Sequence, residues 1–196
     1  NPRVLERLVL LLCDENEAFR RMGIRSLSAV ADDASLQVAF DFLIRNLHPD
    51  ARRAPDGLAP HCPRLDMARV VMAIETLLTP SNAFSHGQQL VARIIGALKG
   101  HLDTDGGRSG YCATDTLSLD LFSRPAVAEA CAPGLAFLLP QYLTRLRSVQ
   151  SLEACAVLCT AVAHICKALP QHDHDHFVDS ADLQELRATP SRSAVP

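Results

Sequence analysis

Apolar residues recur every three or four positions along most of this chain, which is the spacing of one face of an α-helix. The pattern is clearest over 67–78, where six apolar residues keep that spacing: Met67, Val70, Val71, Ile74, Leu77 and Leu78. The alternation of apolar and polar residues that is typical of a half-buried strand occurs in no segment. The sequence therefore predicts an all-α fold.

Asp, Pro and Gly residues divide the chain into expected helices. These helices cover 2–12, 17–31, 35–47, 67–78, 84–100, 113–122, 125–131, 135–146 and 149–169. Pro133-Gly134 is expected to separate two of them, and Pro140 to kink the second or restart it. The last range has strongly polar residues on one narrow stripe only. We therefore expect it to be an inner helix that is covered on more than one side.

The same spacing assigns side chains in the first helices to an inner or an outer face. In 17–31 the residues expected to point inward are Phe19, Met22, Leu27 and Val30, and those expected to point outward are Arg20, Arg21 and Arg25. Asp14 and Glu17 have the spacing of a capping box, which would start this helix. Asp41 and Arg45 lie one turn apart, which predicts an ion pair within a helix.

The length of 196 residues is that of one domain, or of one stretch of a longer repeat array. We expect a single helical domain over 1–187, with an irregular Pro-rich insertion at about 48–64 and a flexible loop at about 103–112. The Ser/Pro tail at 188–196 is expected to be disordered. The chain begins Asn1-Pro2 without Met, so we expect it to be a piece of a longer protein.

Composition argues against several classes of function. A net charge of -3, with 5% aromatic residues and no Trp, gives neither attraction to phosphate nor rings to stack bases, so no nucleic-acid partner is expected. No apolar run reaches about 18 residues without a charge or Pro, so no membrane span is expected. The seven Cys are odd in number and scattered, and no signal peptide is visible, which predicts an intracellular, reducing compartment (cytoplasmic or nuclear).

The expected helices pair off within about 30 to 45 residues, the interval at which helical-hairpin repeats recur. Residues 3–33 combine an apolar first helix, Asp14 in the turn, and arginines in the second helix at Arg20, Arg21 and Arg25. In this they resemble a HEAT repeat, or its armadillo relative. The later units lack the turn Asp and the Arg at matching offsets. The resemblance implies an α-solenoid, a right-handed stack of helical hairpins that displays a surface to protein partners. A compact helical bundle is the alternative fold.

Candidate metal ligands are few. His172, His174 and His176 alternate with aspartates and resemble the His-x-His-x-Asp-His signature of metallo-β-lactamase-like hydrolases, with one residue missing. That family places its ligands after a strand, which this sequence does not predict, so we interpret the histidines as a solvated loop. Cys155, Cys159 and Cys166 lie near one helix face and are interpreted as small core residues. No cofactor is expected.

The sequence thus favours a non-catalytic protein-interaction scaffold, a helical-repeat segment of a larger protein or assembly, rather than an enzyme. Acidic peptides or a neighbouring subunit are the expected partners, and the candidate binding residues are Arg20, Arg21, Arg25, Arg52 and Arg53. Arg145 and Arg147 are interpreted as solvated surface. The alternative function is a metal-binding or enzyme-associated helical domain that uses His172 to His176. A regulatory helical domain of a large kinase or transport factor would have a similar sequence.

Overall fold

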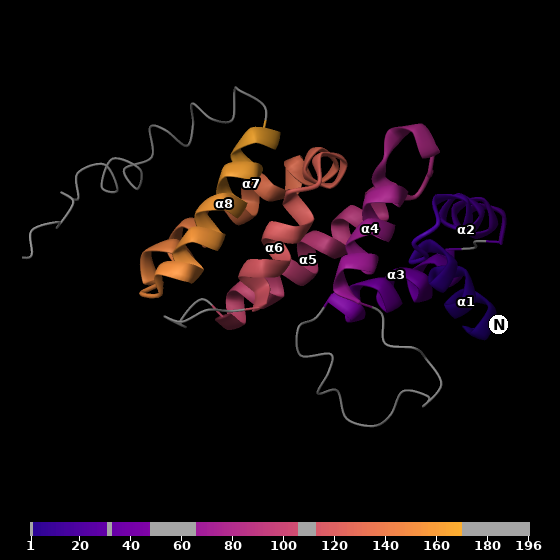
Figure 1. Cartoon of the computed structure of the whole chain (residues 1–196), viewed down its shortest axis with the longest axis horizontal. Coiled ribbons are helices and arrows are strands. Elements are labelled where there is room, and N and C mark those ends of the chain that lie inside the picture. The colour runs from indigo at the N-terminus through magenta and orange to yellow at the C-terminus, as the bar shows by residue number, and fades with distance from the viewer. Residues whose placement is uncertain (1, 31–32, 48–65, 106–112, 170–196) are drawn as a thin grey trace, which may run out of the picture.

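The computed structural model describes residues 2–30, 33–47, 66–105 and 113–169. Every regular element in these ranges is a helix (Figure 1), which confirms the all-α prediction. Several predictions concern residues outside the described ranges. They are the 48–64 insertion with Arg52 and Arg53, most of the 103–112 loop, the histidines His172, His174 and His176, and the 188–196 tail.

Eight α-helices and one 3₁₀ turn are found in the described ranges. They are α1 (Pro2–Leu12), α2 (Glu17–Val30), α3 (Asp33–Leu47), α4 (Met67–Leu78), the 3₁₀ turn η2 (Pro80–Asn82), α5 (Gly87–Asp105), α6 (Ala113–Phe122), α7 (Pro125–Ser148) and α8 (Leu152–Ala168). The expected bounds of α1, α4 and α6 are confirmed. The helix expected at 149–169 begins three residues later, because the Ser151 side chain accepts a hydrogen bond from the backbone N–H of Ala154 at 3.4 Å and caps α8.

The helices follow one another along the long axis of the molecule. In Figure 1, α1 and α2 lie at one end, α4 and α5 lie in the middle, and α8 lies at the other end. α1 packs on α2 and α3, α3 on α4 and α5, α5 mainly on α7, and α6 and α7 on α8. One continuous apolar core runs through these contacts, and Leu12, Phe40, Ile74, Leu90, Leu135 and Leu158 are among its buried members.

Two predicted helix boundaries are wrong, namely the end of α5 at the 103–112 loop and the break expected at Pro133-Gly134 in α7. α5 continues to Asp105, so residues 103–105 are helical rather than part of a loop. The burial of Leu102 extends the apolar face of α5 by a further turn, and Lys99 pairs with Asp103 across that turn at 2.9 Å.

The second error concerns α7, which is one helix rather than two. It passes through Pro133, Gly134 and Pro140 without a break. Each proline removes one backbone hydrogen bond, but α7 buries ten side chains against its neighbours, and this burial outweighs the local preference. Gly134 lies against Ile95 of α5, and a Cβ atom built on Gly134 would come within 2.6 Å of Ile95 Cγ1. The glycine therefore allows α5 and α7 to approach closely.

α7 also has the length and composition of a membrane-spanning helix. Half of its apolar window is buried against the other helices of the fold. Core helices of folded domains have this same character, and α7 contacts four helices, namely α4, α5, α6 and α8.

Ion pairs join helices that are distant in sequence. Asp41 of α3 pairs with Arg93 of α5, so the expected pair between Asp41 and Arg45 is wrong. Arg124, just before α7, pairs with Glu75 of α4 at 3.3 Å. Side chains near a neighbouring helix thus find partners there instead of one turn away, because the packing brings opposite charges together across the helix contacts.

A candidate protein-binding surface on α2

The turn between α1 and α2 is fixed by its own polar side chains. The backbone N–H of Asn16 donates to Asp14 Oδ1 at 2.8 Å, and the backbone N–H of Ala18 donates to Asn16 Oδ1 at 2.9 Å. Asn16 is therefore the residue that caps α2, and the expected capping box of Asp14 with Glu17 is wrong. The Glu17 carboxylate instead accepts from Arg21 at 2.6 Å.

Arg20 belongs to this turn. Its Nη1 donates to the backbone oxygens of Asp14 at 2.9 Å and Glu15 at 2.7 Å. These carbonyls follow the C-terminal end of α1, where backbone oxygens lack partners inside the helix. The half-buried Arg20 side chain therefore ties α2 back to the end of α1.

Arg21 and Arg25 lie on the solvent side of α2, as the sequence predicts, and both are exposed. Arg21 shares an exposed ion pair with Glu17, which at such exposure adds less than about 1 kcal/mol to stability. Both guanidinium groups are therefore accessible to an external anion.

Phe19 and Met22 were expected to point inward, and this is wrong. Their side chains are 45% and 46% exposed. Among the α2 residues whose burial is described, Gly23, Ile24 and Leu27 form the buried strip, and the glycine at position 23 lets the helix lie directly on Leu12 of α1. A Cβ atom on Gly23 would be 3.1 Å from the Leu12 backbone nitrogen. This close approach turns the flank that carries Phe19 and Met22 toward solvent.

These four residues, Phe19, Arg21, Met22 and Arg25, form what we call the α2 outer face. Phe19, Met22 and Arg25 follow one another at a spacing of three residues, and Arg21 lies one turn before Arg25. The two apolar side chains and the two guanidinium groups therefore form one exposed band along the helix. Phe, Met and Arg are the residue types that are enriched in protein interfaces. The sequence predicted the arginines of this surface but not its apolar part, because the spacing of Phe19 and Met22 also fits an inward position.

A buried polar cluster lies between α6 and α7. Arg145 pairs with Asp115 at 3.1 Å, and the Tyr142 hydroxyl lies 2.7 Å from Ser118 Oγ. The interpretation of Arg145 as solvated surface is wrong, since its side chain is buried. Burial raises the pKa of Tyr142 above its ordinary value, with the Asp115 charge acting in the same direction and the Ser118 hydrogen bond opposing them. The phenol therefore stays protonated, and the cluster joins the two helices.

The cysteines of the described residues are free thiols of two kinds. Cys13 and Cys131 are buried, and burial raises the pKa of each thiol from 9.0 to about 12. Cys159 is exposed, and Cys155 and Cys166 are half-buried, so the core interpretation of these three α8 residues is wrong for Cys159. Burial also raises the pKa of Cys159 and Cys166, which lowers the share of reactive thiolate.

Among the described residues, no group of three His, Cys, Asp or Glu side chains is placed to hold a metal ion.

Among the surface cavities of the described residues, two lie beside the core helices. One, of about 220 Å³, lies between the end of α4 and the start of α5, with Leu78, Phe84 and Val91 in its wall. The other, of about 200 Å³, has Leu102, Gln141 and Arg145 in its wall. Both are smaller than the roughly 300–1,000 Å³ of pockets that enclose a small-molecule ligand.

No protein-family model, curated protein or solved structure matches this chain.

Proposed function

We propose that this chain is a non-catalytic protein-interaction scaffold, built as a HEAT- or armadillo-like stack of helical hairpins. The partner segment that we propose for its α2 outer face carries both apolar and acidic residues. The observation that carries the proposal is the exposure of Phe19 and Met22 beside Arg21 and Arg25 on one helix. A single exposed apolar residue is ordinary, whereas two such residues flanked by guanidinium groups have the composition of an interface.

The partner's chemistry follows from the two halves of this surface. Phe19 and Met22 supply an aromatic and a polarizable anchor. Each contributes most to the binding free energy when a partner side chain excludes water from it. Arg21 and Arg25 supply donors for carboxylates, and an arginine can bind a carboxylate through two parallel hydrogen bonds. A partner helix with apolar residues on one side and Asp or Glu beside them satisfies both halves.

The arrangement of the helices supports the stacked architecture. The end-to-end order of α1 to α8 in Figure 1 is the order that a chain of stacked hairpins produces. The turn that contains Asp14, held by Arg20, has the residue types of the resembled repeat. We further propose a reducing, intracellular compartment (cytoplasmic or nuclear), which the free thiols among the described residues support.

Photo-crosslinking from position 19 tests the proposed surface. Phe19 is replaced by a benzoyl-phenylalanine, and proteins that crosslink to it are identified by mass spectrometry. The matched control carries the same group in place of Val38, an apolar residue of α3 that is exposed to a similar extent. A discrete partner that crosslinks from position 19 and not from position 38 is the expected result.

A charge reversal then tests the arginines. Arg21→Glu with Arg25→Glu should abolish capture of that partner, whereas Arg45→Glu, on the exposed side of α3, should leave it unchanged. Equal crosslinking from positions 19 and 38, or capture that survives the double reversal, would show that the α2 outer face is not the binding surface.

A further inference from the structure

α8 is apolar around most of its circumference, but the described residues cover only one side of it. α6 and α7 pack against the side that carries Ala154, Leu158, Ala161 and Ile165, all of which are buried. Away from that side, Leu152 is 87% exposed, and Ala156, Cys159 and Ala163 are exposed as well. The expectation that this helix is covered on more than one side is therefore not met by the described residues.

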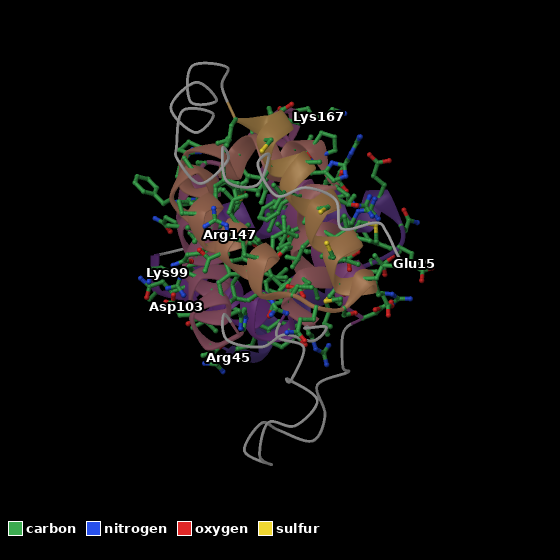
Figure 2. All side chains as sticks on the ribbon, turned by 90° about the vertical axis from the view of Figure 1, so that its left-hand side faces the viewer. Glu15, Arg45, Lys99, Asp103, Arg147 and Lys167 are labelled. Atoms are coloured by element: carbon green, nitrogen blue, oxygen red, sulfur yellow. The ribbon has the colours of Figure 1, made fainter. Side chains whose placement is uncertain are left out.

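We call these four residues, Leu152, Ala156, Cys159 and Ala163, the α8 outer face. Half-buried Cys155, Val162 and Cys166 continue it toward the core, and exposed Glu153, Thr160 and Lys167 border it on its other side. Figure 2 looks directly at this end of the molecule, with α8 in front of the other helices. Exposed apolar surface of this kind usually marks a contact with another segment or another protein.

The chain itself supplies a candidate to cover this face. Residues 170–196 follow α8 in the sequence, and four large apolar residues stand among the other residues of 177–186, namely Phe177, Val178, Leu183 and Leu186. The eight residues from 170 to 177 can span at most about 26 Å. α8 is about 25 Å long at 1.5 Å per residue. Phe177 and the residues after it can therefore reach every level of the α8 outer face.

The segment that follows α8 is acidic, and two cationic side chains are exposed at the end of the molecule where it begins. Segment 172–187 contains five carboxylates, Asp173, Asp175, Asp179, Asp182 and Glu185, and a single arginine, Arg187. Lys167 in the last turn of α8 and Arg147 near the end of α7 are exposed at this end of the molecule, where Figure 2 labels both. An acidic segment that follows α8 is thus attracted to the side of the molecule where its apolar residues can be buried.

We propose that residues 177–186 of this chain pack on the α8 outer face and remove Leu152 and Cys159 from water. The contact lies at the opposite end of the molecule from the α2 outer face, so it is independent of the function proposed above. Its effect is to keep the apolar residues of the α8 outer face from solvent.

Cys159 provides the readout, because the proposed contact shields its thiol. The full chain is alkylated with a maleimide under reducing-agent-free conditions, and the rate at each cysteine is followed by mass spectrometry of its peptide. The test variant is Phe177→Asp with Leu183→Asp. The matched control is Gln171→Asp with Gln184→Asp, which adds the same charge to the same segment at polar positions.

We expect Cys159 to react at least tenfold faster in the test variant than in the wild type or the control. Cys13 and Cys131 are buried in the core, so their rates should stay equally slow in all three proteins and report that the fold is intact. The same Cys159 rate in test and control variants would overturn the proposal. A wild-type rate that slows with rising protein concentration would also overturn it, since the cover would then be a second copy of the chain.

Discussion

Asp115 of α6 and Arg145 of α7 form an ion pair at 3.1 Å inside the core, with side chains only 2% and 1% exposed. Moving two charges out of water is costly, and the attraction between them repays the cost only while both are present. Ser118 and Tyr142, one turn away on the same two helices, add a hydrogen bond at 2.7 Å. The α6–α7 contact thus depends on polar residues as well as on apolar packing.

Removal of one member of this pair should be strongly destabilising. Asp115→Asn keeps the shape of the side chain but leaves the Arg145 charge buried without its carboxylate, and we expect the free energy of unfolding to fall by about 3–5 kcal/mol. Asp115→Leu with Arg145→Met should cost less than Asp115→Asn, because no charge then remains buried. Urea denaturation measures both. Arg124→Met, which removes the exposed pair with Glu75, is the control and should cost less than about 1 kcal/mol.

The contact between Gly134 and Ile95 predicts opposite effects for two glycine substitutions. Gly134→Ala should lower stability by about 1–3 kcal/mol, because its methyl group would overlap Ile95. Gly96→Ala, in the next residue of α5, meets no atom within 4 Å and should raise stability by about 0.5–1 kcal/mol through helix propensity alone. Thermal unfolding of the two variants checks the pair. If both substitutions stabilise the protein, α5 and α7 do not approach as closely as described here.

The orientation of α2 predicts which of its apolar residues the fold needs. Phe19→Ser and Met22→Ser should each change the free energy of unfolding by less than about 1 kcal/mol, because both side chains are about half exposed. Leu27→Ala should cost about 2–5 kcal/mol, since Leu27 is fully buried. Chemical denaturation gives the three values. A larger loss for Phe19→Ser than for Leu27→Ala would mean that α2 is rotated the other way.

The buried thiols predict a loss of stability at alkaline pH. Burial raises the folded-state pKa of Cys13 and Cys131 from 9.0 to about 12, so the unfolded chain loses these protons first. Their contribution to stability is complete below pH 9 and is lost as the pH rises toward 12. Each thiol should lower the free energy of unfolding by up to about 1.4 kcal/mol per pH unit in that window.

Denaturation of the wild type and of Cys131→Ala at pH 8, 9, 10 and 11 checks this prediction. The slope against pH above pH 9 should be shallower in the variant, whatever its stability at pH 8. The Cys131 charge also contributes to the raised pKa of Tyr142, so Cys13→Ala, whose thiol is not among the groups that act on Tyr142, is measured in the same series. Identical slopes would show that the Cys131 thiol titrates alike in the folded and unfolded states.

Features set by neighbouring residues were predictable from the sequence. The ranges of α1, α4 and α6 follow from a spacing that repeats within one or two turns and from the residues that stop it. The exposure of Arg21 and Arg25 to solvent was also predictable from the sequence, because burying a charge without a partner costs free energy. Each depends on chemistry within a few positions along the chain.

Features set by contacts between distant segments could not be predicted from the sequence. The spacing of Phe19 and Met22 fits an inward and an outward position equally, and the close approach of Gly23 to Leu12 decided between them. Asp41 had an arginine one turn away and paired with Arg93 on another helix. Nothing near Arg145 in the sequence marks it as buried, because its partner Asp115 lies 30 residues earlier.

The sequence by itself determined that the described chain is helical, where α1, α4 and α6 begin and end, and that its cysteines lack the pattern of a disulfide framework. These properties depend on residues close together in the chain. Only the tertiary structure decided that α7 continues through two prolines and which faces of α2 and α8 are open to solvent. These outcomes depend on the free energy of packing one helix against another, which is summed over residues far apart in sequence and can exceed a local preference of a few kcal/mol.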